Sequence, residues 1–172
     1  MKPGVPAFSN PLTDTIAAFL VEIGLSIRAG TIDGPTALPG IDIEQGGLVV
    51  DEDKLLYPGD LLHEAGHLAV ALPQQRAAFH HDVGHHPGDE MAAIAWSYAA
   101  ALHLKIDPAL VFHDEGYGGE PGGPANNLAE NFAAGSTVGV PLLAWYGLSC
   151  EPRRATDDMP PFPHMRRWLR ET

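Results

Sequence analysis

The stretch GDLLHEAGHLAV, residues 59–70, contains two histidines four positions apart in an otherwise mostly apolar segment. This segment is predicted to be a helix, because Asp60 can cap its first turn and Pro73 cannot continue it. Positions four apart lie on one face of a helix, so the imidazoles of His63 and His67 can reach a common point. Two imidazoles placed in this way are suited to binding one metal ion.

Glu64 directly follows the first histidine and adds a carboxylate to the same helix. A polar trio inside an apolar helix costs free energy unless its members are paired or bound to a metal. Imidazoles are common ligands of Zn²⁺, which lowers the pKa of a bound water toward ~7, and a nearby carboxylate can accept a proton from that water. The sequence therefore predicts His63 and His67 as metal ligands and Glu64 as a general base.

The segment LLHEAGHLAV, residues 61–70, resembles the active-site helix of the zincin metallopeptidases. The resemblance implies an α+β fold, mainly helical and zincin-like, in which a small β-sheet or hairpin precedes the HExxH helix. It also implies a zinc-dependent metallopeptidase with a peptide or protein substrate. The metzincin branch of this group is excluded, because it would have glycine and histidine where this chain has Val70 and Pro73.

The third metal ligand is predicted to come from a later helix. A catalytic zinc site needs three protein ligands, and the resemblance to gluzincins implies that the third is a glutamate. Glu90 begins the stretch EMAAIAWS, which is similar to the glutamate-led helix of minimal zincin domains. Two alternatives remain open, namely Asp89 and a histidine of the 80–86 segment (His80, His81, His85 or His86). Thermolysin-like gluzincins have an aspartate four residues after the ligand, where this chain has Ile94.

A peptidase of this kind also needs a donor that stabilises the oxyanion. His113 and Tyr117 are candidates, because they lie in HDEGYGGEPGGPANN (113–127), a glycine-rich stretch predicted to be a long surface loop that can shape a cleft. Tyr98, on the helix expected after Glu90, is a third candidate and fits a core position equally well.

The remaining elements are predicted from hydrophobic periodicity and turn residues. Apolar residues at three- and four-residue intervals indicate an amphipathic helix between Ser9 and Gly30. The stretch IDIEQGGLVVD (41–51) indicates a β-hairpin, and DEMAAIAWSYAAALHL (89–104) indicates a buried helix. Further predictions are a loop at 73–88, helices near 126–134, near 140–148 and in HMRRWLRE (164–171), and core positions for Trp96, Trp145, Trp168 and Phe132.

Length and composition limit the classes of protein to which the chain can belong. Its 172 residues suit one compact domain, taken as residues 1–172. The net charge of -12 would repel a phosphate backbone, so no nucleic-acid partner is expected. The apolar stretches fall short of the ~20 residues that cross a bilayer, and the N-terminus lacks the pattern of a secretory signal. A cytoplasmic protein without a membrane partner is therefore predicted.

Together these features predict a zinc-dependent metallopeptidase that hydrolyses a peptide bond in a substrate extended along the hairpin edge. Two other interpretations stay open. The same residues can hydrolyse a non-peptide amide, or the chain can be a catalytically silent zincin-fold protein that acts as a metal-binding or regulatory module.

Overall fold

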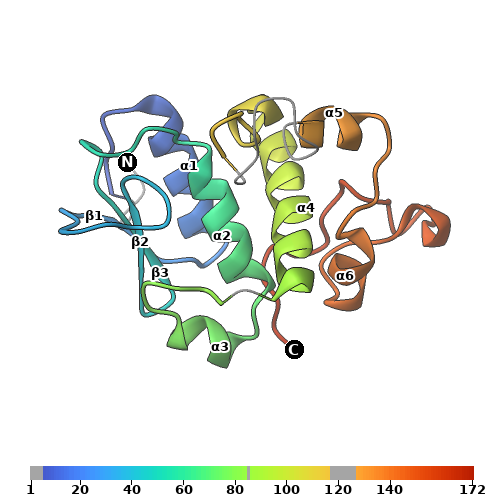
Figure 1. The fold of residues 1–172 in the computed structure, drawn as a ribbon. Coiled ribbons are helices and arrows are strands. Elements are labelled where there is room, and N and C mark those ends of the chain that lie inside the picture. The colour runs from blue at the N-terminus through green and yellow to red at the C-terminus, as the bar shows by residue number, and fades with distance from the viewer. Residues whose placement is uncertain (1–5, 85, 117–126) are drawn as a thin grey trace.

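The computed structural model describes residues 6–84, 86–116 and 127–172. In these ranges the chain has an α+β fold of six α-helices and a three-stranded sheet (Figure 1). The elements are α1 (Pro11–Glu22), β1 (Ile27–Ala29), β2 (Ile41–Glu44), β3 (Gly47–Val50), α2 (Asp60–Val70), α3 (Pro73–Ala78), α4 (Pro87–Leu104), α5 (Leu128–Ala133) and α6 (Val140–Trp145), with short 3-10 helices at Pro108–Leu110 and Pro152–Arg154.

Helix α1 is shorter than the predicted helix between Ser9 and Gly30. It ends at Glu22, because Gly24 has a φ of 97° and lets the backbone N–H of Leu25 turn back to the carbonyl of Leu20 at 2.9 Å. This is the Schellman geometry that terminates many helices. The residues after it form β1, which the periodicity did not predict.

The predicted β-hairpin is confirmed as β2 and β3, which pair in antiparallel register. Gln45 and Gly46 join them with positive φ values of 50° and 75°, as a two-residue type I′ turn requires. Strand β1 pairs with the other side of β3 in parallel, so the sheet order is β1-β3-β2. The central strand β3 is buried along its whole length.

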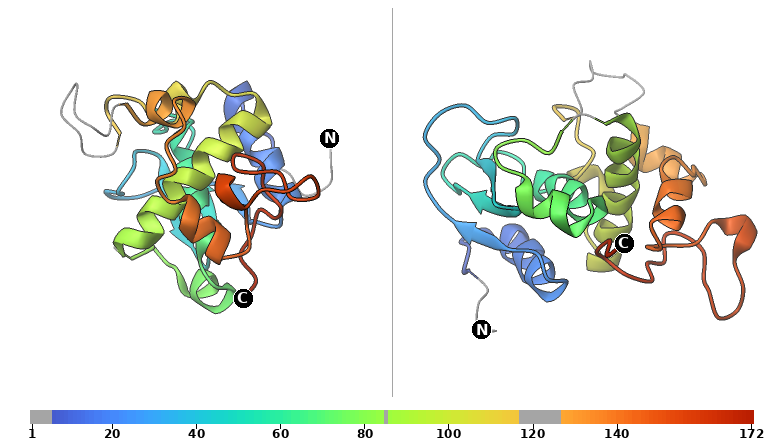
Figure 2. Two further views of the ribbon diagram at one scale, coloured as in Figure 1. Left: turned by 90° about the vertical axis from the view of Figure 1, so that its right-hand side faces the viewer. Right: turned by 90° about the horizontal axis from the view of Figure 1, so that it is seen from below.

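Helix α2 packs closely against α4, and this contact forms the centre of the molecule. Figures 1 and 2 show α2 between the sheet and α4, with α5 and α6 on the other side of α4. The approach is so close that a Cβ on Gly66 would lie 2.8 Å from the carbonyl oxygen of Ala93. One turn further along α4, the hydroxyl of Ser97 lies 3.1 Å from the carbonyl oxygen of Leu62. Small residues on both helices therefore set their separation.

The two ends of α2 differ from the prediction. Gly59 occupies the N-cap position, and Asp60 lies in the first turn, where its carboxylate is bonded to His113 instead of capping the helix. Pro73 does follow the end of α2, but it also begins α3, so the predicted loop at 73–88 contains a helix. The guanidinium of Arg76 in α3 donates to the carbonyls of Leu68 at 2.6 Å and Ala71 at 3.1 Å, which satisfies the C-terminal end of α2.

The predicted final helix over 164–171 is wrong. Its backbone bonds to distant residues instead, since Arg166 N–H donates to Leu148 and Arg170 N–H donates to Ala69, both at 2.9 Å. Trp168 in this segment packs edge-on against Trp96 with ring centroids 5.5 Å apart.

The short helices α5 and α6 lie where helices near 126–134 and 140–148 were predicted. Two of the aromatic core predictions hold, because Trp96 is fully buried and Phe132 is 5% exposed. Trp168 is only partly buried, and the prediction for Trp145 is wrong, since its side chain is 84% exposed on α6.

Within the described ranges, none of the helices combines the length and the apolar character needed to cross a membrane.

Replacing Gly66 with valine should destabilise the protein, because the added carbons would meet the backbone of Ala93. Overpacking of this kind costs about 1–3 kcal/mol. The matched control is Ala78→Val at an exposed position of α3, where helix propensity alone predicts a loss below ~1 kcal/mol. Urea unfolding of the three proteins measures both effects, and equal stabilities of the two variants would contradict the close packing of α2 on α4.

Candidate metal centre

Helices α2 and α4 bring His63, His67 and Glu90 together. The Nε2 atoms of the two histidines are 3.2 Å apart, as their positions one turn apart on α2 require. The carboxylate of Glu90, in the first turn of α4, lies 3.1 Å from Nε2 of His67 and 3.8 Å from Nε2 of His63. One donor atom from each residue lies within 4.8 Å of the others. These three residues are called the ligand cluster below.

The spacing in the ligand cluster fits a metal ion of the size of Zn²⁺. Ligands bound tetrahedrally at about 2.0–2.2 Å lie roughly 3.3–3.6 Å from one another. The two Nε2 atoms are 3.2 Å apart, and the two carboxylate oxygens of Glu90 lie 3.1 Å from His67 and 3.8 Å from His63, so the separations scatter around this range. Two imidazoles and one carboxylate also form the ligand set of several catalytic zinc sites. The cluster could therefore hold a divalent metal through three protein ligands.

The ligand cluster opens to solvent on one side. The side chains of His63 and His67 are 12% and 8% exposed, whereas that of Glu90 is 38% exposed. Burial, followed by the charge of His67, lowers the pKa of His63 to about 4. His63 is consequently neutral near pH 7 and presents a lone pair, the form in which a histidine binds a metal.

Glu64 lies next to His63 on α2, where its carboxyl group is largely enclosed. Burial raises its pKa above the usual value, and the negative charges of Glu90 and Asp60 act in the same direction, while His67 opposes them. A carboxyl group with a raised pKa can exchange a proton closer to neutral pH. This is a property expected of a group that transfers protons during a reaction.

None of the described alternatives for the third ligand belongs to the group of residues that could hold a metal. Asp89 accepts a hydrogen bond from the hydroxyl of Tyr146 at 3.1 Å. His81 pairs with Asp42 at 2.8 Å, and Nδ1 of His86 accepts the backbone N–H of Gly88 at the start of α4. The rings of His80 and His81 contact each other with centroids 4.0 Å apart, and His85 lies outside the described residues. The described geometry therefore favours Glu90.

His113 forms a second polar group beside α2. Its Nε2 lies 2.7 Å from the carboxylate of Asp60, and its ring stacks on Tyr57 with centroids 3.9 Å apart. Burial raises the pKa of Asp60, against the opposing effect of His113. Asp60 precedes Glu64 by four residues and so shares its face of the helix. From the sequence, Asp60 was expected only to cap the helix, and Tyr57 was not singled out. The four-residue spacing between Asp60 and Glu64 was a signal that Asp60 could belong to the site.

Tyr98 and Tyr117 were both candidates for the donor that stabilises the oxyanion. Tyr98 lies on α4 but stacks on Phe132 with centroids 4.7 Å apart, within an aromatic group that also contains Phe162. Tyr98 therefore lies in the core beside α5, which agrees with the interpretation of Tyr98 as a core residue. Tyr117 lies outside the described residues. Ile94 is buried in the core, so it provides no polar support to Glu90.

The outer edge of β2 is occupied by the protein itself. The carbonyl of Ile43 accepts the backbone N–H of His81 at 2.8 Å, and the N–H of Ile41 donates to the carbonyl of Leu38 at 3.3 Å. The side chain of His81 also contacts the carboxylate of Asp42, with Nδ1 and Oδ2 2.8 Å apart. An extended substrate cannot pair with β2 in the predicted way while these segments stay in place.

A hollow of about 200 Å³ adjoins His67 and offers another route to the ligand cluster. It lies between the end of α2, α3 and the start of α4. Its lining is partly apolar and partly polar, and consists of His67, Val70, Ala71, Gln75, Phe79, Val83, Gly84, His86 and Asp89.

Comparisons of the chain with protein-family models, with curated proteins and with solved structures find no match. The function is therefore inferred from the geometry and chemistry of the site.

Zinc added to the metal-free protein should raise its melting temperature, because a ligand that binds only the folded state stabilises it by about 2.7 kcal/mol at 100 times its Kd. We expect one zinc per chain by plasma mass spectrometry. His63→Ala, His67→Ala and Glu90→Ala should lose both the metal and the stabilisation.

Asp89→Asn is the matched control, since it removes the neighbouring carboxylate and keeps an oxygen for Tyr146. This variant should bind zinc like the unchanged protein. Zinc retained in Glu90→Ala and lost in Asp89→Asn would assign the third ligand to Asp89 instead.

Proposed function

We propose that this protein is a zinc-dependent metallopeptidase of the zincin type. The observation that carries the proposal is the convergence of His63, His67 and Glu90 from two helices, with Glu64 adjacent on α2. Two histidines and a glutamate leave a position for water or substrate on a four-coordinate zinc, which is how catalytic zinc sites differ from structural ones. The greater exposure of Glu90 puts such an opening on the solvent side.

Each residue has a defined role in this proposal. His63, His67 and Glu90 would hold Zn²⁺, which lowers the pKa of a bound water and polarises a carbonyl group. Glu64 accepts a proton from the attacking water and delivers it to the amine that leaves. Its position directly after His63 keeps it on the same helix as two of the ligands, so its distance from the reacting atoms varies little.

The hollow beside His67 favours the interpretation that the substrate is a polypeptide. A volume of about 200 Å³ can receive a side chain of moderate size, and Val70, Phe79 and Val83 provide apolar contacts for it. A substrate entering there avoids the occupied outer edge of β2. We therefore place the bound peptide across the hollow and assign no role to strand addition at β2.

Replacing Glu64 with glutamine tests the proposed reaction. The variant should bind zinc normally, but it should cleave peptides ~10²–10⁴-fold more slowly, because amide groups cannot accept the proton. A peptide library analysed by mass spectrometry identifies cleavable sequences, and turnover of one of them gives kcat. Glu130→Gln, an isosteric change at an exposed position of α5, is the control and should keep full activity.

The outcomes of this experiment separate the three interpretations. Peptide cleavage that disappears in Glu64→Gln supports a metallopeptidase. A zinc-loaded protein that hydrolyses small amides and no peptide would indicate a non-peptide amidase. If neither class is hydrolysed although zinc is bound, the chain is a metal-binding or regulatory module, and the proposal is wrong.

We propose that His113 stabilises the oxyanion through Nε2, which exchanges the carboxylate of Asp60 for the substrate, because Nδ1 of His113 is buried. His113→Gln should lower kcat by ~10²-fold, as loss of one oxyanion donor typically does, and should leave the zinc content unchanged. Tyr57→Phe keeps the ring that stacks on His113 and serves as control. An unchanged kcat in His113→Gln would assign the Asp60–His113 pair a structural role.

A further inference from the structure

A second concave region lies in the C-terminal half of the described chain. It consists of two hollows of about 280 Å³ and about 450 Å³. Gly135, Thr137 and Pro152 line both of them, so the hollows adjoin and form one depression. The combined volume is in the range of pockets that bind small molecules. None of the residues of the ligand cluster lines it.

The inner part of this depression is aromatic. Tyr98, Phe132 and Phe162 line it, and the rings of Tyr98 and Phe132 stack at 4.7 Å with an angle of 20° between their planes. Phe162 lies 5.9 Å from Phe132, measured between ring centroids. Among the described residues, the hydroxyl of Tyr98 has no hydrogen-bond partner. Tyr98 and Phe132 are only 7% and 5% exposed, so the half-buried Phe162 and the exposed edges of the two stacked rings form the apolar wall of the depression, and the hydroxyl of Tyr98 offers one polar group.

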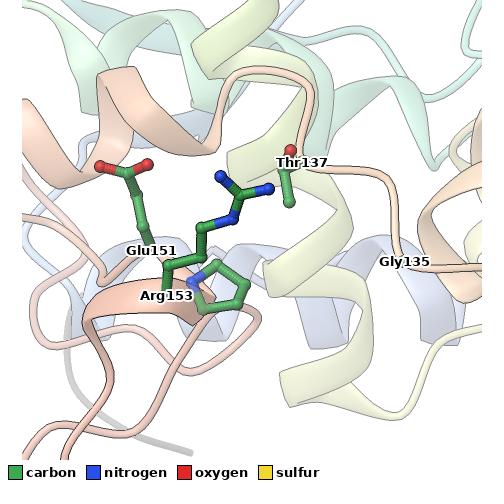
Figure 3. Close-up of a pocket in the computed structure, with 5 residues that line it drawn as sticks. Gly135, Thr137, Glu151 and Arg153 are labelled. Carbon is green, nitrogen blue, oxygen red and sulfur yellow. The ribbon is translucent and has the colours of Figure 1, made fainter.

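The outer part carries Arg153, which forms no ion pair with another residue of the described ranges. Arg153 and Arg154 lie side by side in the 3-10 helix Pro152–Arg154, but Glu151 pairs with Arg154 at 3.6 Å. Arg153 makes no ion pair or hydrogen bond with any residue of the described ranges. Figure 3 shows its guanidinium extending toward Thr137.

Glu151 also lines this part of the depression, but together with Arg153 and Arg154 it leaves an excess of positive charge, which favours a single anionic group on the ligand. A guanidinium presents two parallel N–H groups that match a carboxylate, and this bidentate pairing is stronger than a neutral hydrogen bond. The protein has a net charge of -12, which opposes ligands with several negative charges such as nucleotides. Thr137 adds a hydroxyl beside Arg153 that can contact the same group.

We infer that this depression binds a small aromatic carboxylate. The aromatic ring packs on Phe162 and on the exposed edges of Tyr98 and Phe132, and the carboxylate pairs with Arg153. The inference is independent of the proposed peptidase activity, since it uses none of the residues assigned to that reaction. It gives α4 two functions, because the helix supplies Glu90 to the ligand cluster and Tyr98 to the aromatic depression.

Titration with phenylacetate, followed by amide chemical shifts in NMR spectra of the full chain, tests the inference. Saturable shifts at residues of the depression are expected. Arg153→Gln should weaken binding by ~10-fold, the loss typical for one hydrogen bond to a charged group. Arg167→Gln is the matched control, because Arg167 is exposed and pairs with Glu171 outside the depression, and it should change the affinity less than ~2-fold.

Phenylacetamide is the matched control ligand, since it has the same ring and no charge. It should bind more weakly than phenylacetate to the unchanged protein and equally weakly to Arg153→Gln. The inference is wrong if phenylacetate causes no saturable shifts, if both arginine variants lose affinity to the same extent, or if phenylacetamide binds as well as phenylacetate. Arg153 is exposed, so Arg153→Gln is expected to fold, and its spectrum verifies this.

Discussion

The close contact between α2 and α4 is the constraint on which the rest of the structure depends. Gly66 allows the backbone of Ala93 to approach to a distance that excludes any side chain, and Ser97 adds a hydroxyl contact to Leu62. The ligand cluster exists only because of this separation, since His63 and His67 belong to one helix and Glu90 to the other. A shift of about 1 Å between the helices would disturb a metal site that requires distances within ±0.2 Å.

The electrostatics of the site follow from the same contact. Packing α4 onto α2 removes His63 from water and lowers its pKa, so the ring is neutral and available to a cation. It also encloses Glu64, whose pKa rises for the same reason. Glu90 remains half-exposed at the start of α4, where the helix dipole favours a carboxylate. A divalent cation would offset the cost of holding these groups together without bulk water.

The surroundings of the ligand cluster determine where a substrate can approach. The outer edge of β2 is paired with His81 and Leu38, whereas the hollow beside His67 is open. Helix α3 contributes to this arrangement, because Arg76 attaches it to the end of α2 and the chain then returns along β2. Helix α4 connects this region with the aromatic depression, about two turns further along, where Tyr98 meets Phe132.

The sequence by itself determined those features that arise from local spacing. His63 and His67 lie one turn apart on a helix, and residues 41–50 form a hairpin around a Gln-Gly turn. The helix that contains Glu90 was also predicted from the alanine-rich composition of residues 89–104. Only the tertiary structure decided the parallel pairing of β1, the engagement of Asp60 with His113, the occupied edge of β2 and the extended C-terminal segment. These features depend on contacts between residues far apart in the chain, where a backbone or side-chain group bonds to a distant partner instead of following its local propensity.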